Sequence, residues 1–473
     1  MVKVAALPEN EHSSKGPALP AKPDNDAGIL VDYLRNSSSP LLRYVLVPGW
    51  RTSFKILWLG VTVCLTALFG FLVMVNFERL RDPADAANVV VVRAERPLPI
   101  WSVPFPAVTI CPRKPQGYSG CSGEATPRLE EFCGLICWKD ACTSDCESVL
   151  DAVRTERGLC YTFNGVTGEE LFNVQSVVNV KHLTNGSRPI ENWDFRREHP
   201  VPGQTVLVKQ YPRVAQDVSG RYRLRILFIQ NGQNDTEQCP TPAVDVHIHS
   251  PIDFPFKPTK PVPVVIGTKV QLKVLPSLTS TQRYLRYFSA HTTGCYRQVQ
   301  NPLKLFAIYT QNNCELECHA GMFRDKRGCV LEYMPRTNDM ALCNASANYR
   351  PSDVLDKNAI AQMRAEAIPR SQYFRWACSC LPACLDYGYS YKASTLSLQE
   401  ELYFVVTNET DSLTAELLVD VGEDHFYPSV RSVRYGLLDF VANVGGLMAL
   451  LLGVSVVSLL ELLFFCLLKP ALS

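Results

Sequence analysis

The chain has 473 residues, a net charge of +1 at pH 7 and a hydrophobic fraction of 47%. The length predicts about three structural units, and the near-neutral charge argues against nucleic acid or a strongly acidic substrate as partner. The sequence lacks the short motifs of serine hydrolases, zinc proteases and phosphate-binding loops, so we expect no enzyme, no catalytic residues, no cofactor and no resident metal.

The first long feature in chain order is an apolar run at residues 54–75, with Lys55 as its single charge. About 20 apolar residues suffice to cross a bilayer, so this run is predicted to be a first transmembrane helix. It lacks a small-residue cleavage site and follows a long polar segment, which excludes a signal peptide. Residues 1–53 are therefore expected to form a cytoplasmic tail, disordered over its Ala- and Pro-rich beginning.

A second transmembrane helix is predicted at residues 437–468, followed by a short tail at 469–473. Its apolar part contains one carboxylate, Glu461, which costs several kcal/mol in a membrane unless it faces water or a partner. Glycines and serines also occur inside this run, and small residues let helix backbones approach closely. A pore-lining helix and a helix-packing face of a passive anchor both fit this pattern.

Residues 76–436 hold 16 of the 18 cysteines and four glycosylation sequons, at Asn185, Asn234, Asn344 and Asn408. Dense cysteines together with sequons indicate an oxidising compartment and disulfides. The segment is therefore expected to be an extracellular domain, which leaves both chain termini in the cytoplasm. The predicted fold class is α+β, rich in strands. Alternating apolar residues predict strands at residues 89–92, 105–111, 205–209, 222–229, 244–249, 269–274, 402–406 and 415–421.

Two pairs of cysteines have matching spacings. A helix is predicted at Leu303–Cys318, which places Cys314 and Cys318 on one face about 6 Å apart. In a strand, Cys378 and Cys380 would share a face at about 6.6 Å. Two disulfides can thus tie the helix to the strand, although spacing does not decide which cysteine meets which. A zinc site is the alternative, since these are also metal-ligand spacings; the extracellular location and scattered histidines favour disulfides.

Several motifs together resemble the degenerin/epithelial sodium channel (DEG/ENaC) superfamily, and most closely its arthropod pickpocket branch. They occur in the order of the family between about residues 36 and 468. The matching motifs are Phe105-Pro-Ala-Val-Thr-Ile-Cys111, Gly158-Leu-Cys-Tyr-Thr-Phe-Asn164, His249-Ser-Pro251, Tyr309-Thr-Gln-Asn-Asn-Cys314-Glu-Leu-Glu-Cys318, Gly328-Cys-Val-Leu-Glu-Tyr-Met-Pro335, Cys378-Ser-Cys-Leu-Pro-Ala-Cys384 and Gly445-Gly446 with Gly453-Val-Ser455 and Glu461.

The resemblance implies a trimer of two-pass subunits whose extracellular domain is hand-like, with a palm, a β-ball, a finger and a helical thumb. It implies an amiloride-sensitive, sodium-permeable cation channel with a selectivity filter at Gly453, Val454 and Ser455. The degenerin position, where bulky residues hold such channels open, corresponds to Ala442. Gly445-Gly446 fits either a hinge or a packing notch, and Glu461 either faces the pore or bonds between subunits.

The resemblance also implies five disulfides, namely Cys111–Cys160, Cys295–Cys384, Cys314–Cys380, Cys318–Cys378 and Cys329–Cys343. Six extracellular cysteines remain unassigned by it: Cys121, Cys133, Cys137, Cys142, Cys146 and Cys239. Among these six we expect a Cys137–Cys146 bond. His247 and His249 alternate on a strand as a metal site would require, but the His249-Ser-Pro251 match favours a structural role.

Three departures from the family pattern stand out. The cytoplasmic His-Gly pair is replaced by Pro40-Leu41, and both cysteines of one thumb disulfide are missing. The stretch from Cys111 to Cys160 is short, which predicts a reduced finger and no acid gating.

The sequence thus predicts a plasma-membrane channel subunit in a homo- or heterotrimer, embedded in the lipid bilayer and passing Na⁺ in response to an extracellular cue that the sequence does not identify. A modulatory subunit conducting only in heteromers is the alternative that Pro40-Leu41 favours. A non-conducting two-pass receptor is a further alternative, against which the filter motif argues.

Overall fold

The computed structural model describes most of the chain between residues 51 and 460. The described ranges are 51–81, 89–113, 128–195, 211–216, 218, 222–230, 243–255, 261–344, 349–350, 353, 357–365, 373–397, 413–455, 457–458 and 460. The chain divides into two compact units, one formed by Met1–Asp82 with Tyr435–Ser473 and the other by Pro83–Arg434.

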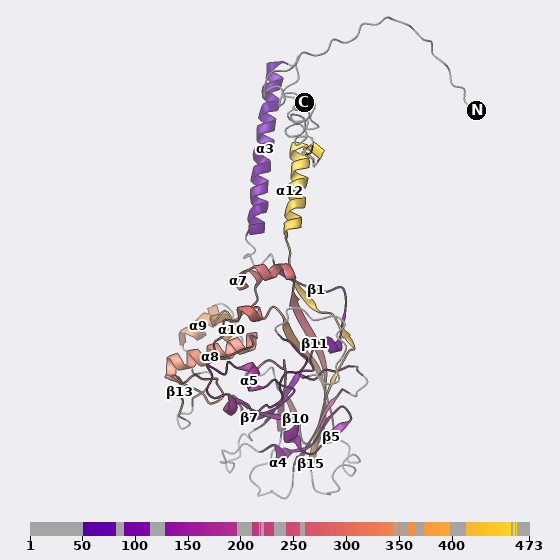
Figure 1. Cartoon of the computed structure of the whole chain (residues 1–473), viewed down its shortest axis with the longest axis vertical. Coiled ribbons are helices and arrows are strands. Elements are labelled where there is room, and N and C mark those ends of the chain that lie inside the picture. The colour runs from indigo at the N-terminus through magenta and orange to yellow at the C-terminus, as the bar shows by residue number, and fades with distance from the viewer. Residues whose placement is uncertain are drawn as a thin grey trace, which may run out of the picture. The chain divides into compact units, whose positions relative to one another are not determined.

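The smaller unit contains two apolar helices that lie side by side, α3 (Thr52–Arg81) and α12 (Leu437–Leu452) (Figure 1). Helix α3 extends the expected run at 54–75 in both directions, and its 29 residues Thr52–Leu80 are long and apolar enough to cross a membrane. Helix α12 has 16 residues, fewer than the roughly 20 that a full crossing needs, because it is interrupted within the predicted second span.

The larger unit is built on two β-sheets. The main sheet has the strand order β1-β17-β11-β15-β8-β4-β5, and β14 also pairs with the long strand β11, along Thr268–Thr279. Its strands are β1 (Val89–Arg93), β17 (Ser429–Val433), β11 (Thr268–Thr281), β15 (Leu413–Val421), β8 (Leu224–Gln230), β4 (Cys133–Trp138), β5 (Ala141–Thr143) and β14 (Asp386–Ser397). Strand β11 is parallel to β15 and β17, and the other pairs are antiparallel.

The second sheet is antiparallel throughout, with the order β10-β9-β3-β7-β6. Its strands are β10 (Val262–Val265), β9 (Ala243–His249), β3 (Ala107–Pro112), β7 (Gly158–Phe163) and β6 (Asp151–Thr155). A hydrophobic core combines residues of both sheets, such as Ile110 of β3 with Ile226 of β8 and Leu417 of β15. Two short ladders complete the strands: β2 (Leu98–Pro99) with β16 (His425–Phe426), and β12 (Cys329–Val330) with β13 (Ala341–Leu342).

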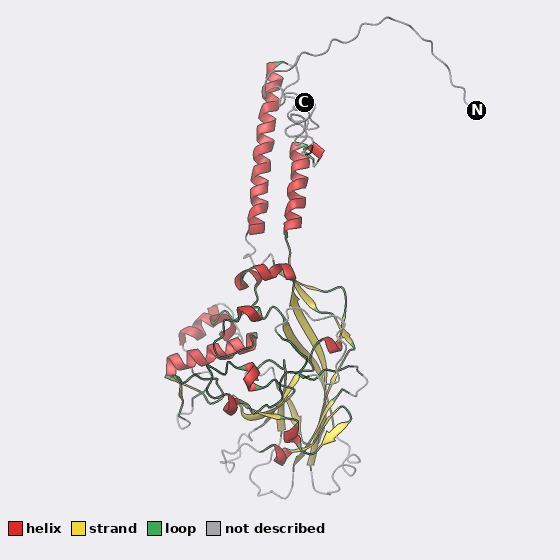
Figure 2. Cartoon of the chain, viewed as in Figure 1, coloured by secondary structure: helices red, strands yellow, loops and turns green. Residues whose placement is uncertain are grey.

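Helices α8, α9 and α10 lie together on one side of this unit, whereas α7 and α4 lie at its opposite ends (Figure 1, Figure 2). The described helices of this unit are α4 (Leu129–Phe132), α5 (Gly168–Leu171), α6 (Val180–Leu183), α7 (Ala290–Thr293), α8 (Gln311–Arg327), α9 (Lys357–Ala365) and α10 (Tyr373–Ala377). Single 3-10 turns lie at Ile100–Ser102, Cys146–Ser148, Arg283–Tyr287 and Gln298–Gln300. A second hydrophobic core packs α8 against the sheets through Leu316, Ala320 and Phe323.

The structure confirms a strand-rich α+β unit and corrects two expected elements. The helix expected at Leu303–Cys318 begins only at Gln311, because Thr310 caps it: the Thr310 side chain accepts a hydrogen bond from the Asn313 amide. Cys378 and Cys380 do not lie in a strand. They lie in the turn after α10, where Ser379 has a φ of 50°. The strands expected at 205–209 and 402–406 lie outside the described residues.

Candidate functional site

Helix α12 carries Ala442, Gly445 and Gly446 of the predicted pore residues, and its start is fixed by local hydrogen bonding. The Asp439 carboxylate accepts a hydrogen bond of 2.8 Å from the Gly436 amide, in the position of a capping box. A carboxylate in the first turn also interacts favourably with the helix dipole. Asp439 therefore has a helix-start role here.

A polar contact ties the beginning of α12 to the end of α3. The Tyr435 hydroxyl donates to Asn76 Oδ1 at 2.9 Å and accepts from Asn443 Nδ2 at 3.2 Å. Phe77 and Phe440 pack edge to face beside it, with ring centroids 6.3 Å apart. The sequence analysis missed these residues, although a polar Asn76 at the end of an apolar run was a visible signal.

The face of α12 turned away from α3 carries small residues. Ala442, Gly446, Ala449 and Gly453 are all exposed, and their spacings of four, three and four residues place them along one helical face. A Cβ atom added at Gly445 or Gly446 would meet nothing within 4 Å. The helix runs through both glycines without interruption, so the structure shows no bend at the position of the possible hinge.

The predicted filter coincides with a break in the helix. Gly453 follows the last helical residue and has a φ of 63°, a left-handed conformation that glycine adopts without steric cost. Its amide donates to the Ala449 carbonyl at 3.1 Å, and the Val454 amide donates to the Met448 carbonyl at 3.4 Å. The backbone therefore favours glycine here, independently of any role in conduction.

The last filter residue begins the next helical segment. The Ser458 amide donates to Ser455 Oγ at 3.4 Å, and the Ser455 amide donates to Ser458 Oγ at 3.3 Å. This reciprocal pair has the form of a capping box with serine in place of glutamate. The spacing Ser455-x-x-Ser458 is the signal in the sequence that could have indicated this cap.

The break places polar backbone at a defined depth of an apolar segment. A 16-residue helix extends about 24 Å at 1.5 Å per residue, so the break lies about that far from Leu437. Irregular backbone at membrane depth is tolerated only where it is buried in protein or lines water. The C-terminal end of α12 also carries the negative end of the helix dipole, which favours a cation. Glu461 lies outside the described residues.

Seven disulfides brace the described part of the larger unit. The five that the resemblance implies are all present: Cys111–Cys160, Cys295–Cys384, Cys314–Cys380, Cys318–Cys378 and Cys329–Cys343. The expected Cys137–Cys146 bond is wrong. Cys137 lies directly opposite Cys142 in the β4–β5 hairpin and bonds to it, while Cys146 bonds to Cys133. Cys121 and Cys239 lie outside the described residues.

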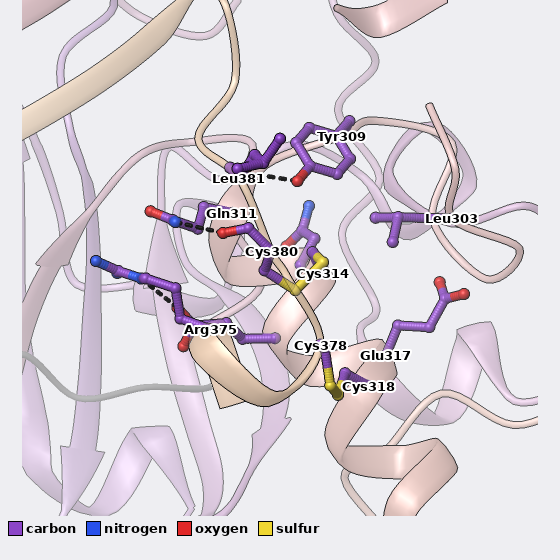
Figure 3. Close-up of a disulfide and its surroundings, with 12 residues drawn as sticks. Leu303, Tyr309, Gln311, Cys314, Glu317, Cys318, Arg375, Cys378, Cys380 and Leu381 are labelled. Carbon is purple, nitrogen blue, oxygen red and sulfur yellow. Dashed lines mark hydrogen bonds and ion pairs between the residues drawn. A yellow bond between two sulfur atoms is a disulfide. The ribbon is translucent and has the colours of Figure 1, made fainter. Parts of the chain in front are cut away.

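Two of these bonds connect α8 to the turn after α10, as Figure 3 shows. Cys314 and Cys318, one helical turn apart, meet Cys380 and Cys378. Hydrogen bonds reinforce the joint, from Gln311 to the Cys380 carbonyl at 2.6 Å and from the Tyr309 hydroxyl to the Leu381 carbonyl at 2.6 Å.

An ion pair lies beside the same joint. Arg375 of α10 donates to Glu315 at 2.9 Å, and the Glu315 side chain is only 1% exposed. A buried carboxylate needs such a partner. The helix α8 is therefore held to α10 and to its following turn at several consecutive positions.

Of the two histidines on β9, His249 has a structural role. Its Nε2 lies 2.7 Å from Thr109 Oγ1 and its Nδ1 lies 2.9 Å from the Ser250 carbonyl. Burial lowers its pKa to about 4, so the ring is neutral at physiological pH. Within the described residues no three metal-binding side chains cluster.

Two of the four sequons can be located. Asn185 and Asn344 are exposed, and Asn185 Oδ1 accepts a hydrogen bond of 2.6 Å from the Ala152 amide. This contact uses the carbonyl oxygen of Asn185, whereas a glycan is attached to the amide nitrogen. Asn234 and Asn408 lie outside the described residues.

Comparison with known proteins gives consistent matches. The family model described as "Amiloride-sensitive sodium channel" matches residues 33–132 and 122–465. Pickpocket protein 28 of Drosophila melanogaster is 23% identical over 358 residues, covering 71% of this chain and 56% of the relative. Pickpocket protein 11 of the same organism is 21% identical over 426 residues, covering 89% of this chain and 73% of the relative. The chain therefore spans little more than half the length of the first relative.

Among solved structures, the cryo-EM structure of a proton-activated chloride channel covers 88% of this chain and 100% of its own. Its TM-score is 0.30 and its sequence identity is 8%. A similarity of this size supports no argument about fold or function.

Proposed function

Because the chain belongs to the amiloride-sensitive sodium channel (DEG/ENaC) family, we propose that it is a subunit of a trimeric, sodium-permeable, amiloride-sensitive cation channel of the plasma membrane. Helix α3 forms the first transmembrane segment, and residues 437–468 form the second. The cysteine-rich unit between them is extracellular, and both termini are cytoplasmic. The chain is then a conductor of ions rather than an enzyme.

The observation that carries this proposal is the helix break at Gly453–Ser455. A passive anchor gains nothing from interrupting its hydrogen bonds inside a membrane, where each unsatisfied backbone group costs several kcal/mol. A pore does gain, because backbone carbonyls and a serine hydroxyl can replace part of a small cation's hydration shell. Interrupted helices serve cation binding in other membrane proteins for the same reason.

The small residues on the free face of α12 support assembly around a common axis. Ala442, Gly446 and Ala449 allow close approach of neighbouring helices and leave room for an aqueous path. The same face ends at Gly453, so copies of α12 packed on this face bring their filter segments together. A trimer satisfies the backbone of the break by facing it to water or to neighbouring subunits.

The disulfide frame supports a mechanism for gating by an extracellular cue. The Cys314–Cys380 and Cys318–Cys378 bonds make α8 and the turn after α10 one mechanical element, which corresponds to the thumb of the family. Displacement of such an element is transmitted as a rigid-body motion rather than absorbed by side-chain repacking. In the proposed channel this motion widens the path lined by Ala442 and the filter.

The proposal is tested by expressing the chain alone and recording whole-cell current from wild type and Ala442→Phe, with and without amiloride. Surface biotinylation of the glycosylated protein provides the control for trafficking. We expect a sodium-selective, amiloride-blocked current in Ala442→Phe, because the family resemblance predicts that a bulky side chain there holds the pore open. No current from either protein at normal surface abundance would contradict a pore formed by this subunit alone.

A further inference from the structure

A cavity of about 200 Å³ lies in the larger unit. It is bounded by β3, β9 and β14, by the turn between β6 and β7, by Asp253–Pro255 after β9, and by Asn312 in the first turn of α8. Its volume is below the about 300–1,000 Å³ of pockets for drug-sized ligands. A small ligand fits it.

The cavity contains a carboxylate without a cationic partner. Within the described ranges no ion pair is formed by Asp253, although its side chain lines the cavity and is mostly buried. Burial raises the pKa of Asp253 from its ordinary value of 3.8 to about 7. A hydrogen bond from the Thr310 hydroxyl lowers this pKa, whereas the nearby carboxylate of Asp386 raises it.

Arg157, the arginine that lines the cavity, already has an ion-pair partner. Arg157 and Arg113 both form ion pairs with Asp245, whose side chain is 1% exposed. His249 is neutral, as described above. The ionisable groups around Asp253 are Glu156 and Arg157 of the β6–β7 turn, His247 and His249 of β9, Glu315 of α8 and Asp386 of β14. Arg157 shares the Asp245 carboxylate with Arg113 and is therefore only partly neutralised, while Glu315 is paired with Arg375. The carboxyl groups of Asp253, Glu156 and Asp386 outnumber this remaining positive charge and favour a positively charged ligand.

The remaining walls are suited to an apolar group attached to that charge. Ile248, Phe254 and Pro255 contribute hydrophobic surface, and Tyr389 contributes an aromatic ring whose hydroxyl is bound to the Pro104 carbonyl at 2.9 Å. Aromatic rings also attract ammonium groups through their negative faces. An anion beside apolar and aromatic walls is the chemistry that recognises an organic ammonium ion.

We propose that this cavity is a binding site for a small organic cation, a primary ammonium compound with an apolar group, whose charge is bound by Asp253. The site is joined to the disulfide-braced helix. Thr310, which hydrogen-bonds Asp253, is the N-cap of α8, and Asn312 of α8 donates to the Phe254 carbonyl at 2.6 Å. Occupation of the cavity therefore changes the contacts at the start of α8. The consequence for gating rests on the proposed channel function; the binding itself does not.

The test is isothermal titration calorimetry on the purified full-length protein in nanodiscs, with phenethylamine as probe and 2-phenylethanol as its neutral isostere. At pH 8 we expect saturable binding of phenethylamine, and binding weaker by about tenfold to a hundredfold for the alcohol, since a charge-assisted bond is lost. Asp253→Asn is expected to weaken phenethylamine binding to the same extent. Asp325→Asn, an exposed carboxylate on α8, is the matched control and should bind like wild type.

A measurement on the unmodified protein guards against a misfolded variant. The ammonium group stays protonated between pH 6 and pH 8, as lysine does with its pKa of about 10.4. The ionised fraction of Asp253 rises from about one tenth to about nine tenths over this range if its pKa is about 7. Affinity should therefore rise about tenfold from pH 6 to pH 8.

Absence of phenethylamine binding, equal binding of amine and alcohol, or an affinity independent of pH would each overturn the proposal. Because calorimetry requires no current, binding without conduction would leave this site intact and count against the pore. Conduction without phenethylamine binding would support the pore and overturn the proposed ligand site.

Discussion

Substitution of Gly453 is the sharpest test of the helix break. An L-residue in the left-handed conformation costs about 1–2 kcal/mol, and alanine favours a continuous helix over glycine by about 0.8–1.0 kcal/mol. Gly453→Ala therefore shifts the balance towards an uninterrupted α12 by about 2–3 kcal/mol in each subunit. This shift corresponds to about 30-fold to 150-fold. Asparagine tolerates the left-handed conformation, so Gly453→Asn should retain most of the break.

The assay is sodium current and sodium-to-potassium permeability ratio per surface-labelled channel, in the Ala442→Phe background. We expect Gly453→Ala to lose current or selectivity, and Gly453→Asn to keep more of both. Gly60→Ala in α3 is the matched control, because Gly60 is helical and an added Cβ there meets nothing within 4 Å. Parental current and selectivity in Gly453→Ala would refute the reasoning, as would equal damage from alanine and asparagine.

Three further predictions concern the larger unit. The Cys314–Cys380 and Cys318–Cys378 bonds close nearly the same loop, with sequence separations of 66 and 60. Replacing both pairs by alanines should lower the free energy of unfolding by about 4 kcal/mol. Replacing only one pair should lower it far less, because the other bond still closes the loop. Thermal unfolding in oxidising buffer measures this, and equal costs for one pair and two would contradict it. The raised pKa of Asp253 means that its contribution to stability is present below about pH 4 and is lost as the pH rises through about 7. Asp253→Asn should then raise the unfolding temperature more at pH 8 than at pH 5. The corresponding gain in the free energy of unfolding is at most about 4 kcal/mol. An equal change at both pH values would show that Asp253 does not titrate there. Asn185→Gln and Asn344→Gln should each remove one glycan's mass on a denaturing gel, whereas unchanged mobility in both would place these exposed sites outside the secretory compartment.

The parts of the fold that the sequence predicted are those set by local pattern. Alternating apolar residues located β9 and β15, because one face of each strand is buried in the core between the sheets. The long apolar run located α3. The two cysteine spacings predicted the ladder on α8 even though Cys378 and Cys380 lie in a turn, since a turn can also present both sulfurs to one helix face.

The parts that the sequence did not predict depend on distant partners. Strand β11 continues to Thr281 because its second half pairs with β14 and then β17, and no alternation within Leu275–Thr281 indicates this. The Cys137–Cys142 bond follows from hairpin register across β4 and β5, which sequence spacing alone does not decide.

The same division applies to the candidate site. Gly453-Val-Ser455 was located through the family resemblance, and its local cap could have been read from Ser455-x-x-Ser458. The contact between Tyr435 and Asn76 joins residues 359 positions apart. No local pattern predicts such a pair, so the tie between the two apolar helices required the structure.

The most direct test of the central claim asks whether the filter segment lies in the conduction path. Ser455→Cys in the Ala442→Phe background would be exposed to a cationic methanethiosulfonate reagent while sodium current is recorded. The same background without Ser455→Cys controls for Cys64, which has no disulfide partner among the described residues. Irreversible loss of current only in the Ser455→Cys protein is the predicted result. Undiminished current, together with biochemical evidence that the introduced thiol has reacted, would contradict a pore at Gly453–Ser455.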